Sequence, residues 1–484
     1  MKRTRTIIIL LAAAAVLALA ALLAVRPLRR AFWPEKTLSE RRSSYAQVQE
    51  TESRSILGGL TRQERRYALD NGDSVVFGRL SAGKDAAYHA IRTDRLDAET
   101  GTVWYYDAEK QDWASEPLGE LELGTTCVYI DGDSQDYFIY VPIGYELLEH
   151  CSLRDNGSRG YLRISRDGGH WSIRMFGASL HAGEVCDYTV VTSTAEEDLI
   201  DFSKPNYRDN WKHYCHDGDG RWCYDGYYFP APELYIPHGP DVRYRCVDAY
   251  IASSMSWQTE IVRCAFDLSP AMLDTMALQQ NDEGYFPSMS ESTWLGDDYG
   301  VRPGYYDTRF NSDLMLLIHD QIGKTGGFED VVERYLAFYQ NFAWSCHYET
   351  ESGGWLVWDY NNSTSPVHCS LNHQLTEIRV LYHYDQLLDI PELTALADKM
   401  LLGIEDTCES WIKEDGNLHY CLLPDGSFGR QDYPYLTYDD LLTLQKELIA
   451  MGRERNAALD TLMASKLAWM QANGVTGYKT DPIE

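Results

Sequence analysis

The pattern of hydrophobic residues changes near Pro232, and this change constrains the possible fold more than any other feature of the chain. From about Tyr67 to Pro232, runs of β-branched and aromatic residues alternate with Asp, Gly and Asn, as in GYLRISRDGGHWSIRMF. Arg-Asp-Gly-Gly between two alternating runs is typical of a β-hairpin. After Pro232 the hydrophobic residues recur at helical spacing. We therefore predict an α+β multidomain protein, with a β-rich sandwich or barrel-like module before a helical domain.

The second half contains eight segments with helical periodicity. They begin near residues 241, 268, 311, 328, 370, 391, 437 and 454. Short connections such as Gly323–Gly327 alternate with long loops rich in Gly, Trp, Tyr and Asp. Paired antiparallel helices with long loops at one end predict an (α/α) toroid of about four helix pairs, whose loops line a cleft. An open array of helical hairpins is the alternative, but no fixed sequence period supports a solenoid.

The first 30 residues predict the location of the protein. Lys2, Arg3 and Arg5 precede an uninterrupted apolar run from Ile7 to Val25, long enough to span a bilayer as a helix. We predict a single-pass signal anchor with the body outside the cytoplasm. The domain prediction is a tail and transmembrane anchor at 1–30, a juxtamembrane linker at 31–60, the β-rich module at 61–235, and the catalytic toroid at 236–484.

Charge and composition limit the partners. The net charge of -30 argues against nucleic acid, which needs a basic surface. Aromatic residues make up 12% of the chain, and their flat rings are suited to stacking on sugars. The eleven cysteines are an odd number; Cys215 and Cys223 could form a disulfide, although isolated buried thiols are commoner.

The segment from Trp355 to Tyr382 combines several features of a functional site. An Asp-Tyr pair, Asp359 and Tyr360, lies in a polar loop before a helix with two stripes. One stripe is apolar and predicts a core face, whereas the other is polar and is formed by Asn372, Thr376, Arg379 and His383. Long loops precede two other helices, so we expect the polar residues of all three loops to converge.

Five elements in this half, in the same order, resemble the C-terminal domain of the D-glucuronyl C5-epimerase family, over roughly Glu283–Leu444. They are Gly284 to Met289, Pro303-Gly304-Tyr305-Tyr306, Asp359-Tyr360 with the helix from Leu371-Asn372 to Leu381-Tyr382, Gly416 to Tyr420, and Asp432-Tyr433. Asp359 stands where the family has Glu, and the loop before Leu371 is about two residues longer. The family also has a membrane anchor and a β-rich middle.

The resemblance implies inversion at C5 of hexuronic acid residues in an acidic polysaccharide, with no organic cofactor. Tyr360, Tyr420 and Tyr433 would transfer protons, Asp359 would orient one of them, and a nearby cation would favour a phenolate. Arg379 and Arg430 are our own candidates for holding the sugar carboxylate. The remaining substrate-binding candidates are Arg302, Arg309, Asn372, Tyr305 and Tyr306.

Three other functions stay open on the sequence alone. The same carbanion could expel the C4 substituent, as in a polysaccharide lyase. A glycoside hydrolase needs two carboxylates, and Asp307, Asp313, Asp359, Glu377 and Asp439 supply enough acids. A non-catalytic glycan-binding protein of the cell envelope is the third. No metal is expected at the site, although Asp131-Gly132-Asp133 and Asp217-Gly218-Asp219 in the β module could bind Ca²⁺.

Overall fold

A computed structural model describes residues 35–55, 59–215, 220–248, 255, 262–362 and 365–481. The chain divides into two compact units. The β-rich unit comprises residues 1–148, 153–224 and 258–271, and the helical unit comprises residues 149–152, 225–257 and 272–484. The predicted transmembrane helix lies outside the described residues and stays a prediction. Within the described ranges, no helix is both long and apolar enough to cross a membrane.

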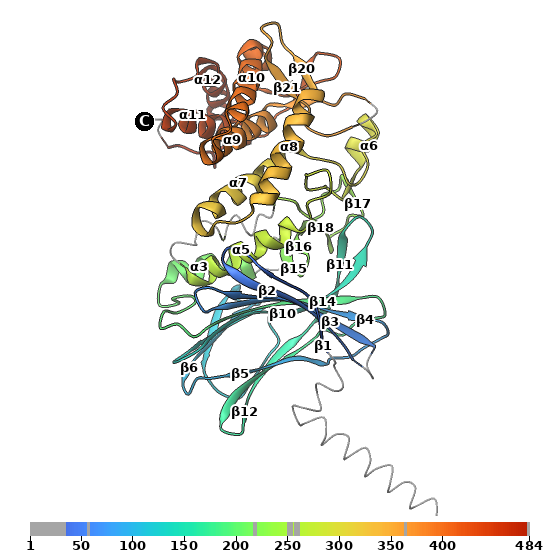
Figure 1. The fold of residues 1–484 in the computed structure, drawn as a ribbon, viewed down its shortest axis with the longest axis vertical. Coiled ribbons are helices and arrows are strands. Elements are labelled where there is room, and N and C mark those ends of the chain that lie inside the picture. Colours follow the sequence, from blue (N-terminus) through green and yellow to red (C-terminus); the bar gives the residue numbers. More distant parts are fainter. Residues whose placement is uncertain are drawn as a thin grey trace, which may run out of the picture. The chain divides into compact units, whose positions relative to one another are not determined.

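Two sheets make up most of the β-rich unit (Figure 1). The large sheet runs in the order β1 (Glu35–Arg42), β2 (Ala46–Arg54), β3 (Leu60–Leu69), β4 (Ser74–Ala82), β14 (Val185–Ser193), β10 (Asp136–Leu148) and β11 (Ser152–Arg159). From β10 it branches through β9 (Cys127–Gly132) and β6 (Gly101–Asp107) to β7 (Asp112–Pro117). The second sheet has the order β5 (Ala90–Leu96), β13 (His170–Phe176), β12 (Tyr161–Asp167) and β8 (Leu121–Leu123).

The two sheets enclose one hydrophobic core, as expected for a sandwich. In β10, Tyr137 and Ile139 point into that core. Phe138, between them, points to the opposite face, where its ring lies 4.8 Å from that of Trp211 in α3 (Pro205–Cys215). Because side chains alternate across a strand, a strand covered on both faces is apolar at nearly every position. This explains the continuous run DYFIYVPIGY in β10.

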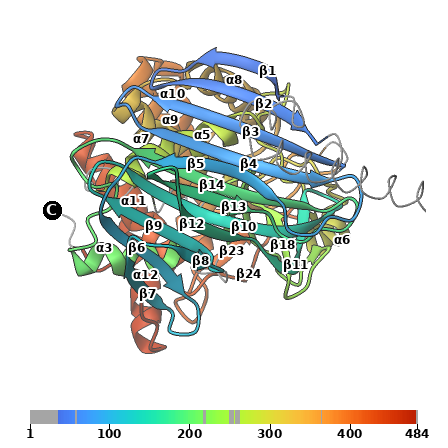
Figure 2. The same cartoon turned by 90° about the horizontal axis from the view of Figure 1, so that it is seen from below.

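Residues 35–54 correct the predicted linker, because they form β1 and β2 at the edge of the large sheet (Figure 2). Ala46 and Val48 are buried on one face of β2. The charged residues that suggested a linker instead pair with neighbouring strands, as Arg65 does with Glu50 at 2.7 Å. Cross-strand ion pairs let a polar sequence form a sheet edge, which composition alone conceals.

Glu64 in β3 is a buried charge held by three arginines. Its side chain is 1% exposed, and its carboxylate lies 3.2 Å from Arg92, within hydrogen-bond distance of Arg66, and 3.9 Å from Arg62. Tyr188 donates to it at 2.5 Å. Burial alone raises the pKa of Glu64, but Arg92, Arg62 and Arg66 outweigh burial and hold the pKa at about 2.

We therefore expect Glu64 to stabilise the fold in a pH-dependent way. Because the pKa is lower in the folded than in the unfolded protein, the stabilisation is present above pH 4.5 and is lost as pH falls towards about 2. Glu64→Gln should lower the free energy of unfolding by about 3 kcal/mol at pH 7. Denaturant titration at several pH values measures this. Glu52→Gln is the control, and a loss that does not shrink below pH 4.5 would contradict the assignment.

The helical unit contains three consecutive hairpins: α7 (Thr308–Thr325) with α8 (Glu329–Ser345), α9 (Leu371–Leu388) with α10 (Pro391–Thr407), and α11 (Leu436–Ala450) with α12 (Ala457–Ala472). Helix α9 contacts α7, α10 and α11 and is buried along nearly its whole length. Its polar stripe is therefore mostly interior: Asn372 and Thr376 are buried, whereas Arg379 and His383 are half-buried. Short strands fill the loops between the hairpins, among them β22 (Cys369–Ser370), β23 (His419–Leu422) and β24 (Phe428–Gln431).

One predicted helix is wrong. Within residues 241–255, Val242–Arg245 forms strand β18, which pairs with β16 (Gly226–Pro230). Val242 and Tyr244 are buried, and Tyr244 contacts Phe229 edge to face. The alternating Val and Tyr residues satisfy the strand period as well as the helix period, and a short segment does not distinguish them. Together with α5 (Arg263–Ala277), the described residues thus supply three hairpins and part of a fourth pair.

Candidate active site

The loops before α7, α9 and α11 bring their polar residues together in the helical unit. Asp307 pairs with Tyr360 as an isolated β-bridge, and the backbone N–H of Thr308 donates to the Asp359 carbonyl at 3.0 Å. The Tyr420 and Tyr433 rings lie 5.7 Å apart. The four residues predicted as catalytic thus share one neighbourhood; that they enclose a cleft stays a prediction.

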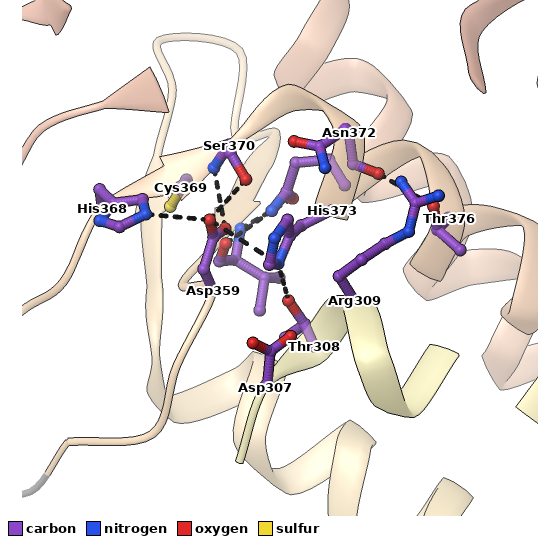
Figure 3. A network of polar contacts seen from close by, with 12 residues as sticks. Asp307, Thr308, Arg309, Asp359, His368, Cys369, Ser370, Asn372, His373 and Thr376 are labelled. Atoms are coloured by element: carbon purple, nitrogen blue, oxygen red, sulfur yellow. Dashed lines mark hydrogen bonds and ion pairs between the residues drawn. The ribbon is translucent and has the colours of Figure 1, made fainter. Parts of the chain in front are cut away.

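Asp359 lies at the centre of this neighbourhood (Figure 3). Its carboxylate is fully buried and accepts hydrogen bonds from the Ser370 backbone N–H at 2.8 Å and the Ser370 hydroxyl at 2.5 Å. His368 Nε2 lies 3.2 Å from Oδ2, and His373 Nδ1 lies 3.7 Å from the same oxygen. Ser370 precedes α9 directly, so the best-packed helix of the unit fixes the position of Asp359.

These contacts keep Asp359 ionised. Burial alone raises its pKa, but the two imidazoles and the Ser370 hydroxyl more than offset this and hold the pKa below its usual value. Burial lowers the pKa of His373 to about 4, and the Asp359 carboxylate opposes that fall. The His373 Nδ1 lies 2.6 Å from the Thr308 hydroxyl.

His368 connects Asp359 to a tyrosine outside the predicted set. The His368 Nδ1 lies 2.9 Å from the hydroxyl of Tyr299, at the end of α6 (Thr293–Tyr299), while Nε2 faces Asp359. A carboxylate on one nitrogen favours the tautomer that carries hydrogen there, which leaves the other nitrogen as an acceptor. In that tautomer the Tyr299 O–H donates to His368 Nδ1. Nε2 approaches Asp359 at 3.2 Å without the alignment of a hydrogen bond. The order Asp359–His368–Tyr299 has the residue types of an acid–base relay.

A cation flanks the tyrosine end of this relay. Burial raises the pKa of Tyr299 to about 12, and Arg430 opposes that rise. The Arg430 guanidinium lies over the Trp294 ring, 4.9 Å from its centre, and pairs with Asp298. Arg430 has a φ of 65°, a left-handed conformation that is uncommon for a large side chain. Strained residues of this kind gather at functional sites.

The three predicted tyrosines have a different protonation from the one expected. Burial raises the pKa of Tyr360 and of Tyr420 well above 10, and burial also raises the pKa of Tyr433. All three hold their protons at neutral pH and can donate them, but none is poised as a phenolate. Arginines oppose this rise at two tyrosines of the site: Arg430 lowers the pKa of Tyr299 and Arg309 lowers that of Tyr433, but burial outweighs both and each pKa stays raised.

The remaining predicted residues divide into two groups. Tyr305 contacts the Tyr360 ring at 5.7 Å, and Arg309 pairs with Asp313 and Asp440 at 2.8 and 2.6 Å, close enough to influence His373. Asn372 is buried beside His373 on α9. Arg379 is held away by two hydrogen bonds to Glu447, and Tyr306 donates to Glu377 in the interior. Arg302 is exposed near Glu291.

Sequence reasoning missed Trp294, Tyr299, His368 and His373. The Trp294 ring stacks on His368 at 5.3 Å, and Tyr360 and Tyr420 approach the same imidazole at 5.5 and 5.8 Å. One signal was available: His368 and His373 are spaced five residues apart on either side of the start of α9, close to Asp359.

The described residues contain no group of three or more His, Cys, Asp or Glu side chains placed to hold a metal ion. Asp133, one of the proposed Ca²⁺ ligands, accepts hydrogen bonds from the backbone N–H groups of Glu99 and Thr100, which is the role of a turn residue. The segment Asp217–Asp219 lies outside the described residues. Cys215 and Cys223 are both buried, and no disulfide joins them.

No family model and no curated protein matches the chain. Similar solved structures include a D-mannose isomerase (12% identity, TM-score 0.34, 47% of this chain and 61% of that chain). A second is a family 76 glycoside hydrolase from a bovine Bacteroides thetaiotaomicron strain (10% identity, TM-score 0.38, 82% of this chain and 75% of that chain). A third is cellobiose 2-epimerase from Spirochaeta thermophila DSM 6192 (14% identity, TM-score 0.38, 55% of this chain and 67% of that chain). At these TM-scores no residue role follows from the likeness.

Proposed function

We propose that this protein is a carbohydrate epimerase that inverts C5 of hexuronic acid residues in a polysaccharide by proton transfer between side chains. The observation that carries the proposal is the Asp359–His368–Tyr299 relay with Arg430 beside its tyrosine. Proton abstraction next to a carboxylate needs a strong base and a cation that stabilises the developing negative charge. Both lie at this end of the relay.

Tyr299 passes its proton to His368 Nδ1, and Asp359 stabilises the imidazolium that forms. The Tyr299 phenolate then removes the C5 proton, while Arg430 binds the sugar carboxylate as it gains enolate character. A protonated tyrosine on the other face returns a proton to C5. Tyr433 fits this role because it is the exposed member of the set and can recover its proton from water. Half-buried Tyr299 then releases the proton taken from C5 to water and takes its own proton back from His368, which restores both residues.

Incubating the full chain with candidate uronans in deuterated water tests the proposal. We expect deuterium at C5 without shortening of the polymer, measured by NMR and by chromatography of the products. An unsaturated sugar end would replace the proposal with a lyase. New reducing ends without exchange at C5 would indicate a hydrolase, and binding without turnover would indicate a glycan-binding protein.

One observation favours the hydrolase as the second candidate. Asp307 and Asp359 lie close together, and their environments shift their pKa values in opposite directions. Burial raises the pKa of Asp307 to about 8, with Asp359 contributing, whereas Asp359 stays ionised. One neutral and one charged carboxyl is the arrangement that an acid–base pair needs. Asp307 also caps α7 by accepting the Phe310 N–H at 3.1 Å.

Asp307→Asn separates the two candidates. Asn reproduces a protonated carboxyl, so in an epimerase we expect near-normal exchange at pH 7. Wild-type activity should fall above pH 8, where Asp307 ionises beside Asp359, and the variant should lack this fall. A pH profile of initial rates measures both effects. If Asp307 is the general acid of a hydrolase, the variant should instead lose about 10²-fold or more in activity. Asp320→Asn, an exposed carboxyl further along α7, is the control.

A further inference from the structure

The inward face of the large sheet changes from apolar to polar at β3. Along this strand, Leu60 belongs to the sandwich core, and the next side chains on the same face are Arg62, Glu64 and Arg66. Strands β1 to β4 lie next to one another (Figure 2), and β4 still contributes Val76 and Leu80 to the core. A sandwich normally continues its apolar pattern on this face, so the polar stretch has a purpose other than packing.

The neighbouring strands continue the polar face. In β2, Gln49 is opposite Arg66 and Gln47 is opposite Ala68, so both glutamines share the face of Arg66. In the second sheet, Arg92 and Asp94 of β5 pair in register with Met175 and Ile173, which are core residues of β13. Arg92 and Asp94 therefore also point inward. The end of the sandwich nearest β5 is lined by hydrogen-bonding side chains from both sheets.

These residues line a cavity of about 800 Å³. That volume lies within the range of about 300–1,000 Å³ found for small-molecule sites. The lining includes three arginines (Arg62, Arg66 and Arg92) and three carboxylates (Glu40, Glu64 and Asp94), so its formal charges cancel. The Tyr67 ring is fully buried, which leaves hydrogen bonds rather than ring stacking as the means of recognition.

We propose that this cavity of the β-rich unit binds a neutral oligosaccharide. Sugar hydroxyls both donate and accept hydrogen bonds, and the guanidinium–carboxylate pairs and glutamine amides of the cavity supply both kinds of partner. Arg92 forms two hydrogen bonds to Asp94, at 2.6 and 3.0 Å, and Arg66 pairs with Glu64 and Glu35. An anion would have to displace these carboxylates, whereas a neutral hydroxyl can be accommodated beside them.

Isothermal titration of the full chain with maltohexaose, cellohexaose and mannohexaose tests the proposal. We expect saturable binding of at least one of them. The variant Gln47→Ala/Gln49→Ala should weaken binding about tenfold or more through the loss of two hydrogen-bonding groups. The Gln47 amide donates to the Arg41 carbonyl and the Gln49 amide donates to Glu40, so this variant leaves the arginine pairs of Glu64 in place. Gln63→Ala, on the opposite face of β3, is the matched control and should bind normally.

Three results would overturn the proposal: no binding of any of the three hexasaccharides at millimolar concentration, binding that the double variant leaves unchanged, or binding of inorganic phosphate or a uronic acid hexamer in preference to all of them. The variant Tyr299→Phe separates this site from the proposed function. It should keep full hexasaccharide affinity whether or not the protein is an epimerase. Loss of affinity in Tyr299→Phe would move the binding site out of the β-rich unit.

Discussion

Tyr299→Phe should lower the rate of C5 exchange by about 10³-fold, because it removes the proton that His368 is positioned to accept. The change deletes one hydroxyl and leaves the ring beside Arg430, so the free energy of unfolding should change by no more than about 1 kcal/mol. Deuterium incorporation and a denaturant titration measure the two quantities. His368→Gln should give a loss of similar size, since the relay then lacks an ionisable centre.

Tyr285→Phe is the matched control for this experiment. Its hydroxyl donates to the Gly304 carbonyl at 3.0 Å and accepts from Asn361 Nδ2 at 3.3 Å, so the substitution costs two hydrogen bonds in the same unit without touching the relay. It should leave the exchange rate within about twofold. If Tyr299→Phe retains full exchange whereas Tyr360→Phe or Tyr433→Phe abolishes it, the base is one of the tyrosines that the sequence resemblance implied.

The largest effect on stability is expected at Lys466. This fully buried ammonium, in α12, donates to Asn417 Oδ1 and Asp432 Oδ2 at 2.6 Å each and to the Tyr433 carbonyl at 2.7 Å. Lys466→Met would leave Asp432 buried without its counter-charge. We expect the helical unit to lose about 3–5 kcal/mol of unfolding free energy. Chemical denaturation followed by far-ultraviolet circular dichroism, which reports helix content, measures it.

Two further variants show whether the buried pair is the cause. Lys413→Met removes an exposed ammonium that contacts Gln431 at 3.1 Å, and should change stability by less than about 0.5 kcal/mol. Combining Lys466→Met with Asp432→Asn removes both charges and should recover a good part of the loss. A double variant as unstable as the single one would mean that the lysine contributes through packing alone.

The sequence predicted those parts of the fold whose period is long and regular. Helices α7 to α12 follow from segments of fifteen or more residues with a clear helical repeat, and the β-rich first half follows from its turns. The edge strands β1 and β2 were not predicted. Their charged residues form ion pairs with neighbouring strands, and without those strands the sequence resembles a charged linker. Strand β18 was too short for its period to be read.

The candidate site was predictable in part for the same reason. Asp359, Tyr360, Tyr420 and Tyr433 came from ordered motifs, and they do lie near one another. Tyr299 and His368 came from no motif, because 69 residues separate them in sequence and only folding makes their hydrogen bond. The arginines show the converse limit. Arg379 was predicted to bind the sugar carboxylate because of its position in α9, but its guanidinium forms an ion pair with Glu447 of α11.

The clamp between Asp359 and Ser370 has a consequence for how this protein could diversify. It joins two positions eleven residues apart, so the ends of the intervening loop are fixed by the core and not by the loop itself. Changes confined to the stretch from Asn362 to Pro366 would then leave Asp359, Tyr360, His368 and Ser370 in place while changing what they face. Such changes would alter substrate specificity without rebuilding the residues that handle the proton.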